Sequence, residues 1–213
     1  LAIGTDRGNV LGVPFISFLA PGLIAMQVIQ QAFSHSSSTF MIGKVQGNIV
    51  DILYAPLSPG EVCVAIIFAA VTRSLMIAVI SIITFNFIVD LSIYHFFYLA
   101  YFTFVSAFIL GAIGIIAGLW AEKFDHMATV TNFIIVPLSF LSGTFYSIER
   151  LPGILHTISQ YNPFFYMIDG FRFTFINTSD GSITIGLIYL AALSIVLYFV
   201  TYLLLKKGYK LKS

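Results

Sequence analysis

The chain has 213 residues, of which 59% are hydrophobic and 9% are charged, and its mean hydropathy is +0.98. Soluble domains carry about 25% charged residues, so this composition excludes a soluble globular domain and predicts an integral membrane protein. The net charge of +1 gives no sign of a nucleic-acid partner, and the single cysteine, Cys63, excludes an internal disulfide and a cysteine-ligated metal cluster.

Five apolar segments are long enough to cross a hydrocarbon core about 30 Å thick as helices. We expect the first segment to be interrupted at Pro21-Gly22 and to fray in the polar run that follows it. Because the segments are continuously apolar and lack the alternation of a membrane barrel, they predict an all-α polytopic helix bundle that forms one domain, 1–213. The predicted spans are 15–33, 62–88, 96–119, 128–145 and 183–205.

A polar and amphipathic segment, residues 43–61, separates the first two spans. Helical spacing places its apolar side chains on one side and its polar side chains on the other. Pro56 is expected to end this helix, and Ser58-Pro59-Gly60-Glu61 predicts a capping box that starts the next one. We expect the segment to receive force from a soluble partner. Its candidate contact residues are Lys44, Val45, Ile49, Asp51, Ile52, Leu53, Pro56, Ser58 and Glu61.

The basic residues predict the orientation, because lysine and arginine favour the cytosolic side. Four lysines follow the last span, so we expect the C-terminus in the cytosol. Counting back then places residues 43–61 and 121–127 inside the cell and residues 148–182 outside. Residues 1–4 resemble the end of a helix leaving a membrane, so we expect a missing upstream span and six spans in the complete protein.

The connection at 148–182 contains two strongly apolar stretches that are too short to span a membrane. Segments of this length are more often re-entrant or interfacial, so we predict two short outer helices. Tyr161, Phe164, Phe165 and Tyr166 fit an interfacial aromatic belt, and Asp169 is expected to pair with Arg172 three residues later on a helix. The candidate residues of this outer segment are Leu151, Pro152, Pro163, Tyr166, Asp169 and Arg172.

Arg73 lies about 22 Å along the helix that starts after Ser58. An ionisable residue in the membrane interior is a candidate pathway residue. A helix that begins well inside the cytosol would instead let Arg73 reach the inner head groups, and we favour this second interpretation.

Two further features concern the packing and the shape of the helices. Gly114-x-x-x-Gly118 permits a close helix approach, and Pro137 is expected to kink the fourth span.

The sequence has no Gly-x-x-x-x-Gly-Lys-[Ser/Thr] motif, so we do not expect this chain to hydrolyse ATP alone. It has no membrane-embedded series of acidic and histidine residues, which argues against an ion-coupled pump. It also has no arrangement of a nucleophile with a base and no His-x-x-Glu-His type of metal site. We therefore predict a protein that is not an enzyme, with no catalytic, cofactor-binding or metal-binding residues.

Several sequence blocks occur together in the order and spacing of one family. They are residues 48–58 (NIVDILYAPLS), 121–125 (AEKFD), 137–146 (PLSFLSGTFY), 151–152 (LP), 162–166 (NPFFY) and 169–172 (DGFR). With these blocks the chain resembles the ABC-2-type transport permeases, the membrane subunits of bacterial exporters of drugs, lipids or polysaccharides. It departs from the family pattern at the N-terminus, where an amphipathic helix and a first span would be expected.

The resemblance implies a bacterial inner-membrane permease that pairs with a second copy, usually as a homodimer. Two separate ATPase subunits, which hold the ATP and magnesium, would bind beneath it at a coupling helix within 43–61. The short outer helices would close the exit, and a hydrophobic drug, lipid or lipid-linked glycan would move outward between the two permeases. Two alternatives stay open: a non-transporting inner-membrane scaffold and, with less support, an ion-coupled secondary carrier.

Overall fold

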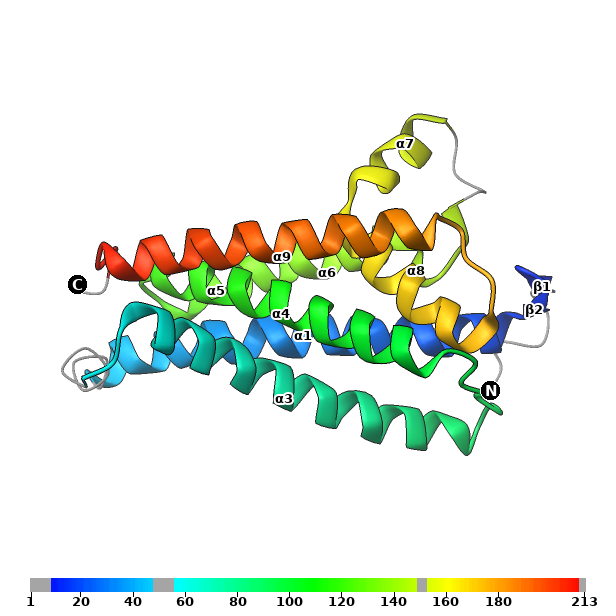
Figure 1. Ribbon diagram of the computed structural model, residues 1–213, viewed down its shortest axis with the longest axis horizontal. Helices are drawn as coiled ribbons and strands as arrows, with labels where there is room; N and C mark the ends of the chain where they lie inside the picture. Colours follow the sequence, from blue (N-terminus) through cyan, green and yellow to red (C-terminus); the bar gives the residue numbers. More distant parts are fainter. Residues whose placement is uncertain (1–8, 48–55, 149–152, 211–213) are drawn as a thin grey trace.

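The computed structural model describes residues 9–47, 56–148 and 153–210. Within these residues five long helical segments run side by side (Figure 1), and each is long and apolar enough to cross a membrane. The predicted all-α polytopic bundle is confirmed. The segments are α1 (Phe15–Gln46), α3 (Pro59–Asn86), α4 (Phe96–Trp120), the irregular segment Phe124–Thr144 and α9 (Ile183–Lys206).

The connections gather at the two ends of this bundle. A short hairpin of β1 (Asn9–Val10) and β2 (Val13–Pro14) lies at one end, together with the α3–α4 turn and two short helices (Figure 1). The end of α1, the start of α3 and the end of α9 lie at the other end (Figure 1). We name these the outer end and the inner end, following the predicted orientation.

The central element is α1, which packs against α4, α3 and the short helix α8 (Pro163–Ile176). The prediction that its serine-rich part frays is wrong, because α1 continues to Gln46. The hydroxyls of Ser38 and Thr39 donate to the carbonyl oxygens of Ser34 (2.6 Å) and His35 (2.8 Å). These polar groups are therefore satisfied inside the helix and do not compete with it.

The helices α1 and α4 approach each other closely at two glycines. A Cβ atom at Gly114 would lie 2.6 Å from the carbonyl oxygen of Phe33, and one at Gly118 would lie 2.8 Å from that of Ser37. Real Cβ atoms do not come so near, so no larger residue fits without movement of the backbone. The predicted role of Gly114-x-x-x-Gly118 in close helix approach is confirmed.

The fourth span is not a regular helix. Pro137 lacks an N–H and would clash with the carbonyl one turn earlier. In the wider turn just before it, the N–H of Val136 donates to the carbonyl of Thr131, which removes that crowding. The predicted distortion is confirmed and takes the form of π-helical turns. The parts are α5 (Phe124–Val130), η1 (Thr131–Ile135), α6 (Val136–Ser139) and η2 (Phe140–Thr144).

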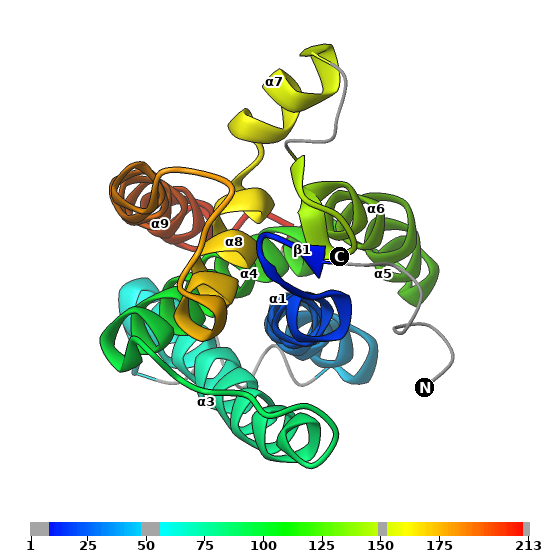
Figure 2. The same cartoon turned by 90° about the vertical axis from the view of Figure 1, so that its right-hand side faces the viewer.

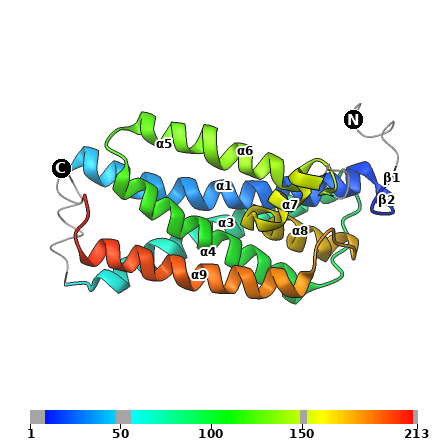
Figure 3. The ribbon, with the colours of Figure 1, turned by 90° about the horizontal axis from the view of Figure 1, so that it is seen from above.

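The short outer helices are α7 (Gly153–Tyr161) and α8. Helix α8 inserts between α1, α4 and η2 and is mostly buried, whereas α7 projects from the bundle (Figure 2). Seen from above, α5 and α6 lie on the opposite side of α1 from α9 (Figure 3). The interfacial prediction is wrong for Phe164 and Phe165, which are 4% and 1% exposed and belong to the core.

Candidate functional site

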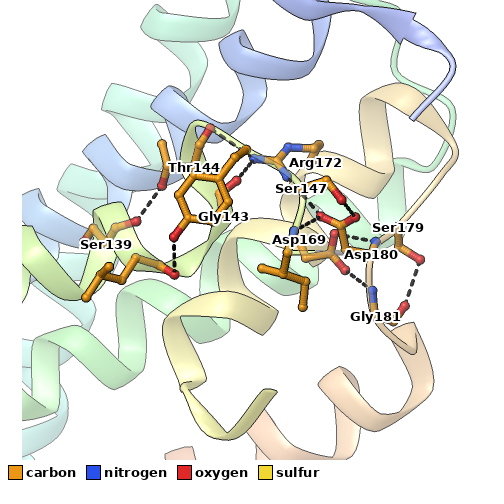
Figure 4. Close-up of polar contacts among 12 residues, drawn as sticks. Ser139, Gly143, Thr144, Ser147, Asp169, Arg172, Ser179, Asp180 and Gly181 are labelled. Carbon is orange, nitrogen blue, oxygen red and sulfur yellow. Dashed lines mark hydrogen bonds and ion pairs between the residues drawn. The ribbon is translucent and has the colours of Figure 1, made fainter. Parts of the chain in front are cut away.

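A buried arginine organises the outer end. Arg172 of α8 is 1% exposed, and its Nη2 donates to the carbonyl oxygens of Gly143 (2.7 Å) and Thr144 (3.3 Å) at the end of η2 (Figure 4). Gly143 has a φ of 80°, which suits glycine and turns the chain out of the helix. The last carbonyls of a helix have no donor within it, so Arg172 completes η2 from a neighbouring helix.

The charge of Arg172 is balanced by Asp180, which lies in the turn before α9. Nη1 of Arg172 is 4.0 Å from Oδ2 of Asp180, and both side chains are buried. Asp180 also accepts hydrogen bonds from the hydroxyl of Ser147 and from the backbone N–H of Ile148 (3.4 Å). Buried charges need such partners. The cluster therefore joins α8, the chain after the fourth span and the turn before the last span.

The expected pairing of Asp169 with Arg172 is corrected by the structure, in which Asp180 forms the ion pair. Asp169 instead accepts hydrogen bonds from the backbone N–H groups of Asp180 and Gly181, each at 3.0 Å. The turn before α9 folds back over α8 and supplies both these donors and the carboxylate. Burial raises the pKa of Asp169 to about 6, against the lowering effect of the N–H donors and of Arg172.

Phe18 and Gly22 of α1 lie against the guanidinium group of Arg172. Cζ of Arg172 lies 3.7 Å from the ring centre of Phe18, a cation–π contact. A Cβ atom at Gly22 would lie 2.8 Å from Nη2 of Arg172 and 2.9 Å from the carbonyl oxygen of Thr144. Because α1 runs on through Pro21, the Pro-Gly pair does not interrupt the span. Gly22 opens the surface of α1 to the arginine.

The remaining predicted outer residues position α8. Pro163 is its first residue, and Oδ1 of Asn162 accepts from the N–H of Phe164 (3.0 Å), which caps the helix. The ring of Tyr166 meets the ring of Tyr189 on α9 edge to face, with centres 5.5 Å apart. Leu151 and Pro152 lie outside the described residues.

At the inner end, Lys44 caps α4. Its Nζ donates to the carbonyl oxygens of Gly118 (3.0 Å), Leu119 and Ala121 (3.1 Å). A cation at this position is favourable, because the last carbonyls of a helix are unpaired and carry partial negative charge. Within the fold, its charge joins α1 to α4. The expected contact of Lys44 with a partner stays a prediction.

The flanks of the 43–61 segment present apolar surface. Val45 and Leu57 are 59% and 52% exposed.

The predicted capping box is confirmed, because the N–H of Glu61 donates to Oγ of Ser58 (3.3 Å) and the N–H of Ser58 donates to Oε2 of Glu61 (2.7 Å). Pro56 is the first described residue after the gap. Four of the expected contact residues lie outside the described residues: Ile49, Asp51, Ile52 and Leu53.

Arg73 is exposed at the middle of α3, 14 residues after Pro59 and 13 before Asn86. Its Nη1 lies 3.4 Å from Nδ1 of His35 on α1. The contact directs the side chain across to the neighbouring span.

Sequence reasoning missed Asp180, Gly143 and Gly22 of the outer cluster, and also Phe18 and Ser147. The sequence of residues 177–181 by itself indicates only a turn before the last span. Signals were nevertheless present, because an arginine in an apolar helix needs a carboxylate or carbonyl partner, and a glycine inside a span often marks a close contact. Spacing along the chain cannot pair residues that are this far apart.

Comparison with known proteins gives consistent matches. The model of the family described as ABC-2 type transporter matches residues 3–176. The chain is 29% identical over 211 residues to the inner membrane transport permease YadH of Escherichia coli K12, which covers 99% of this chain and 82% of that protein. It is 25% identical over 210 residues to nodulation protein J of Neorhizobium galegae (96% and 79% covered). It is 26% identical over 212 residues to nodulation protein J of Rhizobium leguminosarum bv. viciae (96% and 80% covered).

Proposed function

The chain belongs to the ABC-2 type transporter family, and from this premise we propose that it is the permease of an exporter driven by a separate ATPase. The family and its helices make it a multi-pass transport subunit of the inner membrane. The observation that carries the proposal is the family match over residues 3–176 in a sequence without a phosphate-binding loop. On this proposal, the energy for transport comes from another chain.

The inner end supports the proposed coupling to an ATPase. Exposed Val45 and Leu57 flank residues 48–55, which add further apolar side chains in the sequence. The capping box at Ser58 starts a 28-residue helix directly after this segment. A force applied at the segment would therefore act on the end of a long span. We infer that the segment docks on the ATPase while Lys44 keeps α1 and α4 together.

The outer end supports a proposed role as the exit side. Helix α8 is fixed to η2, α1 and the turn before α9 through Arg172 and Asp180. These contacts let the outer helices follow movements of three spans. We propose that two copies of the permease assemble with two ATPase subunits, that the C-terminus is cytoplasmic, and that a hydrophobic drug, lipid or lipid-linked glycan leaves between the copies.

The test is to co-express the full-length protein with the ATPase of its neighbouring reading frame and to purify the complex through a tag on the permease. The expected result is co-purification, together with ATP-dependent movement of a fluorescent phospholipid or drug in proteoliposomes. Absence of any ATPase from the purified protein would favour a scaffold. Transport that follows a proton or sodium gradient and ignores ATP would favour an ion-coupled carrier. Either result overturns the proposal.

A further inference from the structure

A polar stripe runs along one face of α1. Gln27, Gln31, Ser34 and Ser38 follow one another at intervals of four, three and four residues, which places them on the same side of a helix. Gln27 and Ser34 are exposed, and the other two are half-buried. Viewed from the outer end, α1 has α3 on one side and α5 and α6 on another (Figure 2). Amide groups on such a face would be costly against lipid.

Arg73 joins this stripe from the neighbouring span. Its contact with His35 brings a guanidinium beside the polar face of α1. The position is deep: at 1.5 Å per residue, Arg73 lies about 21 Å from the inner end of α3 and about 20 Å from its outer end. An arginine side chain is much shorter than either distance. The guanidinium therefore stays at the level of the membrane interior.

The chain offers Arg73 no carboxylate at this depth. Within residues 9–47, 56–148 and 153–210 the two ion pairs are Arg172–Asp180 and Lys210–Glu122. A second copy of the chain would bring the same residues and a second arginine, so a symmetric pair does not neutralise the charge. Six of the nine carboxylates of the sequence belong to the described residues, and none of these six lies in the middle of a long span. They are Glu61, Asp90, Glu122, Asp125, Asp169 and Asp180.

We propose that Arg73, His35 and the polar stripe of α1 bind the oxyanion group of a transported amphiphile, such as a phosphate, sulfate or carboxylate on an apolar tail. This inference rests on the proposed export function and names a substrate class for it. A guanidinium binds such groups through two parallel hydrogen bonds. A neutral His35 that accepts from Arg73 at Nδ1 carries its proton on Nε2 and supplies another donor. The Gln27 and Gln31 amides add further donors along the stripe.

Because the site is deep in the membrane, the anion is expected to belong to a transported molecule and not to a lipid head group of the surrounding bilayer. Head groups of the surrounding bilayer lie at the membrane surface and not near the middle of α3. A charge interaction is also stronger in this low-dielectric region than in water. An anion that reaches Arg73 therefore has to be carried there, and an apolar tail gives it a route along the helices.

The test uses the complete permease–ATPase complex in nanodiscs of phosphatidylcholine, with dodecyl phosphate as the probe. Dodecyl maltoside, which is uncharged, and dodecyltrimethylammonium, which is cationic, serve as comparison amphiphiles. Binding is measured by calorimetry without ATP, and ATP hydrolysis is measured separately. We expect the complex to bind dodecyl phosphate at least about tenfold more tightly than dodecyl maltoside.

Four variants locate the site. Arg73→Gln should remove the preference for dodecyl phosphate, and Arg73→Lys should retain part of it, because the charge remains while the planar fork is lost. Gln31→Leu should weaken binding a few-fold with the charge intact, which gives a second readout if Arg73→Gln fails to fold. Lys207→Gln, at the exposed inner end, is the control for general electrostatic attraction and should bind like the unmodified complex.

Three outcomes would overturn the inference. The first is an unchanged preference for dodecyl phosphate in the Arg73→Gln variant. The second is equally strong competition by inorganic phosphate, which would make a free anion the ligand. The third is a combination of two results: the Arg73→Lys and Arg73→Gln permeases both fail to assemble with the ATPase, and the parent complex shows no preference for dodecyl phosphate. These results would make Arg73 an assembly residue. If binding depends on Arg73 but never changes ATP hydrolysis, the site stands and the exporter proposal fails.

Discussion

The guanidinium carbon of Arg172 lies 3.7 Å from the ring centre of Phe18, and this contact joins the short helix α8 to the start of the central helix α1. The same guanidinium donates to the end of η2 and faces Asp180 before α9. One side chain from a segment that does not span the membrane therefore holds three spans together at the outer end.

The first prediction concerns that side chain. Arg172→Gln should lower the stability of the protein by about 3–5 kcal/mol, because it leaves Asp180 buried without a cation. Thermal unfolding of the purified protein in detergent measures the loss. Lys210→Gln is the matched control, since its partner Glu122 is exposed, and it should lower the midpoint much less than Arg172→Gln does. Equal midpoints for the two variants would show that the buried cluster does not hold the outer end.

The second prediction concerns the space beside Arg172. Gly22→Ala should destabilise the protein by about 1–3 kcal/mol, because its Cβ would press on the guanidinium and on the backbone of Thr144. Gly60→Ala is the control at a helical glycine where the nearest atoms lie at an ordinary 3.7 Å. The two thermal midpoints should differ, with Gly60→Ala at or above that of the parent protein.

The third prediction separates a structural role of Lys44 from a role in partner contact. Lys44→Met should cost about 1–2 kcal/mol, because three carbonyl oxygens near the end of α4 lose their donor. The folded fraction should still bind the ATPase, as judged by co-purification per mole of permease. Lost ATPase binding with an unchanged thermal midpoint would assign the lysine to the partner surface.

The fourth prediction concerns the proposed ATPase contact. Val45→Asp, and the double change Ile52→Asp with Leu53→Asp, should weaken association with the ATPase by about tenfold or more while membrane insertion stays intact. Ile93→Asp is the control, because Ile93 is an exposed apolar residue (44%) at the opposite end of the bundle. Undiminished co-purification of the ATPase with both inner variants would refute a docking role for 43–61.

The fifth prediction is a pH dependence at the inner end. The hydrogen bond and charge of Lys210 lower the pKa of Glu122, and the same hydrogen bond raises the pKa of Lys210. The folded state thus favours both charged forms. The stabilisation should be present at neutral pH, fall as the pH drops through the lowered pKa of Glu122, and also fall as the pH rises through the raised pKa of Lys210.

This pH dependence is measured as the difference in thermal midpoint between the parent protein and Glu122→Gln. The difference should be largest near neutral pH and should shrink as the pH falls through the lowered pKa of Glu122, where Glu122 becomes protonated in the parent as well. High salt should reduce it at every pH, because the pair is exposed. A difference that is the same at low and at high salt, and that does not change as the pH falls from neutral into the acid range, would show that the pair does not form in solution.

Much of the bundle could be predicted from the sequence because its signals are local. Continuous apolar runs locate the spans, and Ser58 with Glu61 carries a complete capping box within four residues. Gly114 and Gly118 likewise mark a close helix contact by their spacing alone. These features depend on neighbours in the chain, so reading the chain in order recovers them.

The outer cluster could not be predicted, because its members come from distant parts of the chain. The spacing of Asp169 and Arg172 suggests a pair, but it cannot show that Asp180 folds back to take the ion pair. The serine-rich part of α1 was misjudged for a different reason. Hydroxyls can bond to the carbonyl one turn back, so Ser38 and Thr39 do not end a helix that the rest of the fold supports.

The two π-helical turns of the fourth span have a consequence for how the chain tolerates insertion and deletion. A π turn holds one residue more than an α turn, and one residue corresponds to about 100° of rotation around the helix axis. A π turn takes up its extra residue locally, so removing one residue within Thr131–Ile135 would restore regular winding there and leave the carbonyls of Gly143 and Thr144 facing Arg172. Removing one residue from the regular helix α5 would instead rotate everything beyond it about the axis and take those carbonyls away from Arg172. The fourth span therefore tolerates a change of length at η1 better than in α5.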